Sequence, residues 1–138
     1  MSYDSQNIFA KILRAENPCN KVYEDDATLA FMDIMPQAPG HTIVIPKEPA
    51  ITLFDLSGAG AANLIQVVQR VAAAVKQAMQ AEGIMLMQLN GAAAGQTVDH
   101  IHFHIIPGSM HNLGKHASSG NVADDLAALA EKISACLT

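Results

Sequence analysis

The chain has 138 residues, of which 50% are hydrophobic and 15% charged, and its formal net charge is −5. This length and hydrophobic content predict one folded domain over residues 1–138 and argue against disorder. No Lys/Arg cluster is present, so no nucleic acid polymer is expected as a partner. Polar residues interrupt every apolar stretch, so neither a signal peptide nor a membrane span is expected. Cys19 and Cys136 lie far apart and form no C-x-x-C pair, which indicates a cytoplasmic protein with free thiols.

Apolar spacing and turn residues predict the elements in chain order. Helices are expected over residues 8–14, 58–81 and 122–136. Strands are expected over residues 21–24, 28–33, 41–45, 84–90 and 100–105. Ser57 is expected to cap the long helix, Gly83 to follow its end at C′, and Asp124 and Asp125 to begin the last helix. Short turns join neighbouring strands, so the pattern predicts an α+β fold. That fold is an antiparallel sheet of about five strands with one long central helix and terminal helices.

The most informative segment is the run His100-Ile101-His102-Phe103-His104-Ile105. Polar and apolar residues alternate strictly in it, as they do in a half-buried strand. Side chains alternate faces along a strand, so the three imidazoles are expected on one side and the apolar residues in the core.

Three interpretations of these histidines are open. His100 and His102 have a spacing that two zinc ligands can share. The histidines can instead belong to the surface of an edge strand. In the third, catalytic interpretation, a neutral imidazole attacks phosphorus while its neighbours donate hydrogen bonds to the phosphate.

The loop that precedes this strand favours the catalytic interpretation. Residues 90–97 read Asn-Gly-Ala-Ala-Ala-Gly-Gln-Thr, and small side chains let main-chain amides approach a phosphate. Asn90, Gln96 and Thr97 add polar groups. Such a loop alone is a weak signal, because most Gly/Ala loops are only turns.

Several runs, in order, resemble one known family. They are Val22–Asp26, Leu29–Ile34, Pro39–Lys47, Asn90-Gly91 and Gly95–Pro107. The last run resembles the signature of the histidine-triad (HIT) family of Hint- and Fhit-like nucleotide hydrolases. The resemblance covers roughly residues 7 to 108 by this motif comparison.

This resemblance implies an α+β fold, a homodimer that joins two sheets, and a nucleotidyl hydrolase or transferase. The substrate implied is a small-molecule nucleotide conjugate, a nucleoside phosphoramidate or a dinucleoside polyphosphate. It is cleaved at the α-phosphate through a nucleotidyl-histidine, which releases a nucleoside monophosphate. An apolar slot accepts a purine, no cofactor is implied, and a nucleotide-binding regulatory module with vestigial catalysis is the alternative.

By position, the resemblance implies that His102 is the nucleophile, that His104 contacts the phosphate and that His100 fixes the nucleophile's ring. Thr97 matches a hydroxyl residue near the leaving group. The remaining positions match the substrate-binding residues of the family: Asp33 for the ribose, Phe31, Ile34, Ile8 and Phe9 for the base, Asn90, Gly95 and Gln96 for the phosphate, and His41 beside the triad.

Each of these has a structural alternative. The four apolar residues can simply be core, and Asp33 can be a turn cap. Some bacterial relatives carry a structural zinc on a Cys-x-x-Cys and a later histidine. Here those positions are Asn7, Ala10 and Pro49, so no metal is expected. The motif Gly95-Gln96-Thr97 favours dinucleoside polyphosphates as substrates, whereas the length of the chain is equally typical of the phosphoramidases of the family.

Overall fold

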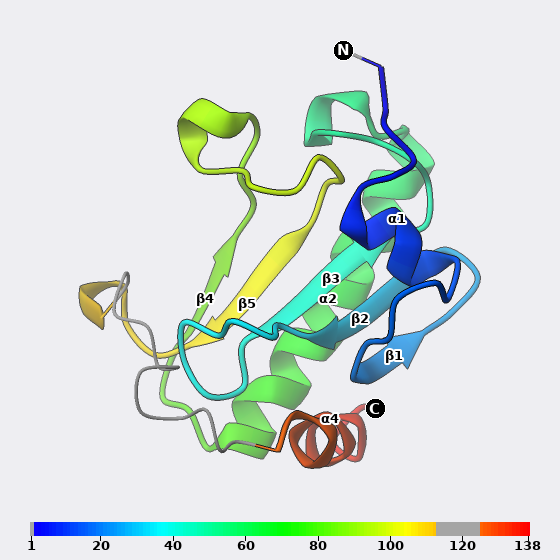
Figure 1. The fold of residues 1–138 in the computed structure, drawn as a ribbon. Coiled ribbons are helices and arrows are strands. Elements are labelled where there is room, and N and C mark those ends of the chain that lie inside the picture. The colour runs from blue at the N-terminus through cyan, green and yellow to red at the C-terminus, as the bar shows by residue number, and fades with distance from the viewer. Residues whose placement is uncertain (1, 113–124) are drawn as a thin grey trace.

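Five strands form one antiparallel sheet in a computed structural model that describes residues 2–112 and 125–138 (Figure 1). They are β1 (Lys21–Glu24), β2 (Thr28–Met32), β3 (Thr42–Pro46), β4 (Ile84–Met87) and β5 (Phe103–Pro107). The order in the sheet is β1-β2-β3-β5-β4 and every pairing is antiparallel. The predicted α+β fold is therefore confirmed.

Within residues 2–112 and 125–138, three helices accompany the sheet: α1 (Ile8–Leu13), α2 (Gly58–Met79) and α4 (Leu126–Ser134). Three short 3-10 turns complete the described elements: η1 (Leu53–Asp55), η2 (Ala92–Ala94) and η3 (Met110–Asn112). None of the helices in residues 2–112 and 125–138 has the length and apolar character needed to span a membrane.

The two faces of the sheet are covered differently (Figure 1). Helix α2 packs on one face against β3, β5 and β2, and α4 packs beside it against β1 and β2. The buried stripe of α2 packs against the inward residues of the strands in one apolar cluster; it consists of Leu64, Val67, Val68, Val71 and Val75. On the opposite face, the short helix α1 covers a smaller cluster that contains Phe9, Phe31 and Ile43.

Caps explain where the helices begin and end. The Ser57 side chain accepts a hydrogen bond from the Gly60 amide, as predicted for the start of α2. The end of α2 differs from the prediction, because Gln80, not Gly83, adopts the left-handed conformation with φ 51°. The Asp125 side chain caps α4 by accepting a hydrogen bond from the Ala128 backbone amide. The helix therefore begins at Leu126, four residues later than expected. Residues 122–124, which were predicted to be helical, lie outside the described residues.

The histidine strand is shorter than its alternating pattern predicted, because β5 begins at Phe103. His100 and His102 lie in the segment that leads into it. The backbone amide of Ile101 donates to Ala50, outside the ladder, and the His102 side chain bonds to the His100 carbonyl. Similarly, β4 ends at Met87, short of the predicted Asn90. The predicted sides are nonetheless correct, since Ile101 and Ile105 are buried in the cluster beneath α2.

Candidate active site

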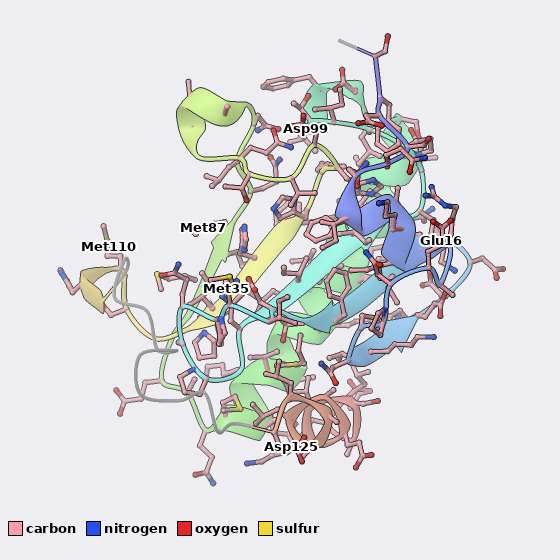
Figure 2. All side chains as sticks on the ribbon, in the orientation of Figure 1. Glu16, Met35, Met87, Asp99, Met110 and Asp125 are labelled. Carbon is pink, nitrogen blue, oxygen red and sulfur yellow. The ribbon has the colours of Figure 1, made fainter. Side chains whose placement is uncertain are left out.

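A cleft of about 960 Å³ opens on the α1 side of the sheet. Its walls come from α1 and the residues after it, from β2 with its following loop, from β3, β4 and β5, and from the loop between β4 and β5. Figure 2 shows Met35 on the loop that follows β2 and Met87 on β4, and both line the cleft. No Lys or Arg side chain from residues 2–112 and 125–138 lines it, and Asp33 is its one acidic residue among them.

Most of the predicted site residues line this cleft. They are His102, His104, Thr97, Asp33, Ile34, Phe31, Ile8, Phe9, His41 and Gly95. Three do not line it: His100, Asn90 and Gln96. Ile34 is the most open of the apolar residues at 70% exposed, whereas Phe9 and Phe31 are buried and pack edge to face.

Strand alternation explains why residues distant in sequence meet here. Phe31 on β2 pairs with Ile43 on β3, and Ile43 in turn pairs with His104 on β5. His41, two residues before Ile43, and Asp33, two residues after Phe31, continue the same face beyond the strand ends. Gly40, with φ 92°, makes the turn into His41, and a Cβ there would come within 2.7 Å of Met79 Cγ.

His102 has the geometry of a nucleophile. Its Nδ1 lies 2.7 Å from the carbonyl oxygen of His100, so Nδ1 carries the proton and donates it. Nε2 then holds a lone pair, and no atom of the described residues hydrogen-bonds to it. Burial lowers the pKa of His102, which keeps the ring neutral. Phe9 packs its ring edge to face against His102, with centroids 4.9 Å apart.

A chain of hydrogen bonds fixes the proton on His104. The backbone amide of Gln37 donates a hydrogen bond to Nδ1 of His41, so a neutral His41 carries its proton on Nε2. That Nε2 lies 2.9 Å from Nδ1 of His104 and donates to it. His104 therefore carries its own proton on Nε2. This proton belongs to a ring at the cleft wall, where it can be donated to a phosphate oxygen.

Burial keeps both of these rings uncharged. It lowers the pKa of His41 to about 3, with smaller contributions from His104 and His102. It also lowers the pKa of His104 to about 4, with a contribution from His102. Burial raises the pKa of Asp33, although the Met35 amide that bonds to its carboxylate opposes the shift. Nε2 of His41 lies 3.3 Å from Asp33, but a neutral imidazole forms no ion pair with it.

The same three residues have the spacing of a metal site, with ligand atoms of Asp33, His41 and His104 within 4.8 Å of one another. The hydrogen bonding does not fit a metal ion. If Nε2 of His41 bound a metal ion, the ring proton would have to be on Nδ1. Nδ1 accepts a hydrogen bond from the Gln37 backbone amide, so it cannot carry that proton. We therefore assign this cluster to proton positioning.

His100 is fully buried, at 0% exposed, and both of its ring nitrogens are engaged. Nε2 donates to the carbonyl oxygen of Pro46 at 2.8 Å, and Nδ1 lies 2.5 Å from the Tyr3 hydroxyl. Burial lowers its pKa, partly offset by the Pro46 hydrogen bond. No lone pair of His100 remains for a zinc ion shared with His102.

The Gly/Ala loop is held by its polar side chains. The Gln96 amide group donates to the carbonyl oxygens of Ile51 and Val98 and accepts from the Gly91 amide. Asn90 accepts from the Leu53 amide and bonds to Gln88. Gly95 lines the cleft with φ 108°. Gln96 and Asn90 thus shape the loop from behind, and Thr97 and Gly95 reach the cleft.

Sequence reasoning missed several residues of the site. Asn17–Asn20 line the cleft, although their local pattern resembles an ordinary loop, and Gln37, which lines it too, donates its backbone amide to His41. Tyr3 bonds to His100 from 97 positions away. The one available signal for Tyr3 is an aromatic hydroxyl in an otherwise polar N-terminal stretch, which is not specific.

Comparisons with known proteins agree on one family. The HIT domain family model matches residues 14–111. The chain is similar to adenosine 5'-monophosphoramidase hnt1 of Schizosaccharomyces pombe, with 39% identity over 92% of this chain and 95% of that protein. It is 40% identical to the adenylylsulfatase HINT3 of Arabidopsis thaliana over 72% of this chain and 51% of that protein.

A solved structure extends this likeness to nearly the whole chain. It is the crystal structure of a Hit-like protein of Bartonella henselae, described as involved in cell-cycle regulation and holding an unknown ligand. The TM-score is 0.86 and the identity 49%, over 99% of this chain and 100% of that one. The chain belongs to the histidine-triad (HIT) family.

Proposed function

We propose that this protein is a nucleotidyl hydrolase that cleaves nucleotide conjugates at the α-phosphate through a nucleotidyl-histidine at His102. The observation that carries the proposal is the hydrogen bond from Nδ1 of His102 to the His100 carbonyl, 2.7 Å long, which leaves the lone pair on Nε2 of a ring at the cleft wall. The relatives named as an adenosine 5'-monophosphoramidase and an adenylylsulfatase support the same class of reaction.

The first step follows from the tautomers. Nε2 of His102 attacks phosphorus and forms a P–N bond, while the bond from phosphorus to the leaving group breaks and that group takes a proton from solvent water. The Nδ1 proton stays on the ring, where the His100 carbonyl stabilises the positive charge that develops. Nε2–H of His104 donates to a non-bridging oxygen, and we assign Thr97 to the leaving-group side.

In the second step, water attacks phosphorus, the P–N bond to His102 breaks, and the nucleoside monophosphate leaves. The neutral ring is restored with its proton on Nδ1. We propose that the base occupies the apolar part of the cleft formed by Ile8, Phe9, Phe31 and Ile34, as a purine would. Asp33 is then available to accept hydrogen bonds from the ribose hydroxyls.

The charge of the cleft favours one branch of substrates. A dinucleoside polyphosphate carries several negative charges, and the part of the chain that the structure describes lines the cleft with no Lys or Arg to compensate them. A phosphoramidate carries one phosphate group, which the imidazole and backbone N–H donors can satisfy. We therefore propose a phosphoramidate as the preferred substrate, released as an amine and a nucleoside monophosphate.

The deciding experiment compares kcat/KM for adenosine 5'-phosphoramidate and a diadenosine polyphosphate on the purified protein. We expect the phosphoramidate to give the higher value. A single-turnover reaction quenched without acid should show, by intact mass, one adenylyl group on the protein, mapped to His102. Nucleotide binding without turnover or adduct would instead indicate a regulatory module with vestigial catalysis.

We also propose that the chain is a single HIT domain over residues 1–138 that forms a homodimer. Strand β4 is an edge of the sheet, and its Leu86 is 48% exposed in the single chain. A partner strand along this edge would cover that side chain and join two sheets. Light scattering of the purified protein should give twice the chain mass. The predicted cytoplasmic location and lack of a cofactor remain predictions from the sequence.

A further inference from the structure

The segment before α1 contacts the histidine row directly. The Tyr3 hydroxyl lies 2.5 Å from Nδ1 of His100, and the two rings pack edge to face with centroids 5.6 Å apart. Because Nε2 of His100 donates to the Pro46 carbonyl, Nδ1 of the neutral ring carries a lone pair. The Tyr3 hydroxyl is therefore the donor, and it completes the hydrogen bonding of the buried His100 ring.

His100 in turn positions the group that orients the nucleophile. Its carbonyl oxygen accepts the Nδ1 proton of His102. This part of the chain precedes β5 and lies outside the strand ladder, where the Ile101 amide makes a backbone hydrogen bond to Ala50. The His100 ring, held by Pro46 on one nitrogen and Tyr3 on the other, is a second anchor for the same carbonyl.

The segment that carries Tyr3 is fixed independently of His100. The Asn7 side chain donates to the Asp4 carbonyl, and the Asp4 carboxylate accepts from the Gln6 amide. Arg14, at the end of α1, donates to the Ser5 carbonyl at 2.7 Å. Tyr3 is thus presented to His100 from a folded turn, and removing its hydroxyl leaves these contacts in place.

We infer that Tyr3 is a positioning residue for the reaction proposed above: its hydroxyl fixes the His100 ring, and through the His100 carbonyl it keeps the proton of His102 on Nδ1. Tyr3 does not line the cleft, so it acts through His100 and not on the nucleotide. The inference rests on the proposed function for its effect on rate, but its effect on the His102 tautomer can be measured without a substrate.

The test is the variant Tyr3→Phe, which keeps the ring and removes the hydroxyl. We expect kcat to fall about tenfold, because His102 loses its fixed orientation, with KM within about twofold of the wild-type value. Tyr23→Phe is the matched control. It also removes one tyrosine hydroxyl, which bonds to Asp25 and Arg70 away from the cleft, and its kcat should be unchanged.

The second measurement is the tautomer of His102, read from long-range ¹H–¹⁵N correlations of its ring nitrogens. We expect a single Nδ1–H tautomer in the wild-type protein and in Tyr23→Phe, and a mixture of tautomers in Tyr3→Phe. An unchanged kcat or a single Nδ1–H tautomer in Tyr3→Phe would overturn the inference, and so would a rise in KM at unchanged kcat, which would mean that Tyr3 supports only the α1 wall. If the wild-type protein turned over no substrate, the proposed function would fail, and the tautomer would still decide the role of Tyr3.

Discussion

The two faces of the sheet bury different kinds of side chain. The face under α2 and α4 buries a large apolar cluster, in which Val44, Val68 and Ile105 are fully buried. The cleft face buries His41, His100 and His102 to 5% exposed or less. Packing accounts for most of the stability of the first face. Its buried polar groups are few: the Thr42 hydroxyl donates to the Gly40 carbonyl, and Thr28 Oγ1 has no hydrogen-bond partner among the described residues. The second face is stable because its imidazoles are neutral and each ring makes at least one hydrogen bond.

This contrast implies that stability and chemistry are largely separable in this fold. Substitutions beneath α2 should act on the free energy of unfolding, whereas substitutions on the cleft face should act on rate or on pH dependence.

The largest effect is expected for His102→Ala on the cleft face. Removing the nucleophile should lower kcat/KM by about 10³-fold or more, because no other group in the row can form the covalent intermediate. Turnover of adenosine 5'-phosphoramidate measures the rate, and circular dichroism should show the wild-type fold. Retention of activity within about tenfold would contradict the assignment.

Beneath the helix-covered face, Leu64→Ala should have the next largest effect. Leu64 lies on α2 and is 1% exposed, so its truncation leaves a cavity and should lower the free energy of unfolding by about 2–5 kcal/mol. Urea denaturation measures this loss. At temperatures where the variant is folded, kcat should match the wild type, and a parallel loss of kcat would show that the two faces are coupled.

The third effect is the pH dependence of stability, which should come from the cleft face. Histidines in the unfolded chain take up protons below about pH 6.5, whereas burial lowers the pKa of His41 to about 3 and that of His104 to about 4. The unfolded state therefore binds more protons in this window. Stability should fall as pH drops from 6.5 toward 4, by about 1.4 kcal/mol per pH unit for each such group.

The variant His41→Gln isolates one of these groups. Its side-chain amide still offers a donor toward His104, and one buried histidine no longer titrates. The slope of unfolding free energy against pH should become shallower by one proton, as measured by urea denaturation between pH 6.5 and 4.5. The raised pKa of Asp33 acts in the opposite direction in both proteins. Identical slopes would show that His41 is not part of the linkage.

The fold was largely predictable because hydrophobic periodicity sets it. The stripe from Leu64 to Val75 predicted α2, and the Ser57 cap predicted its start. The element ends were predicted less well. The run from His100 reads as a strand, but β5 starts only at Phe103, because the segment before it bonds to Ala50 and, through side chains, to Pro46 and Tyr3. Local alternation carries no information about such partners.

In the candidate site, the sequence predicted the types of residue but not their hydrogen-bond partners. His104 was expected near a phosphate, but its tautomer depends on His41 and on the Gln37 amide, which a turn after β2 delivers. Gln96 was expected at the phosphate, yet its amide group is bonded to Ile51, Val98 and Gly91. These contacts join segments far apart in the chain, and no local pattern specifies them.

The sequence by itself determined the antiparallel sheet, the helix that covers one face and the side to which the three imidazoles point, since each follows from periodicity and side-chain alternation. Only the tertiary structure decided which nitrogen of each imidazole carries the proton. That choice depends on single donors and acceptors, Gln37, Pro46 and Tyr3 among them, that folding brings within hydrogen-bond distance of the rings.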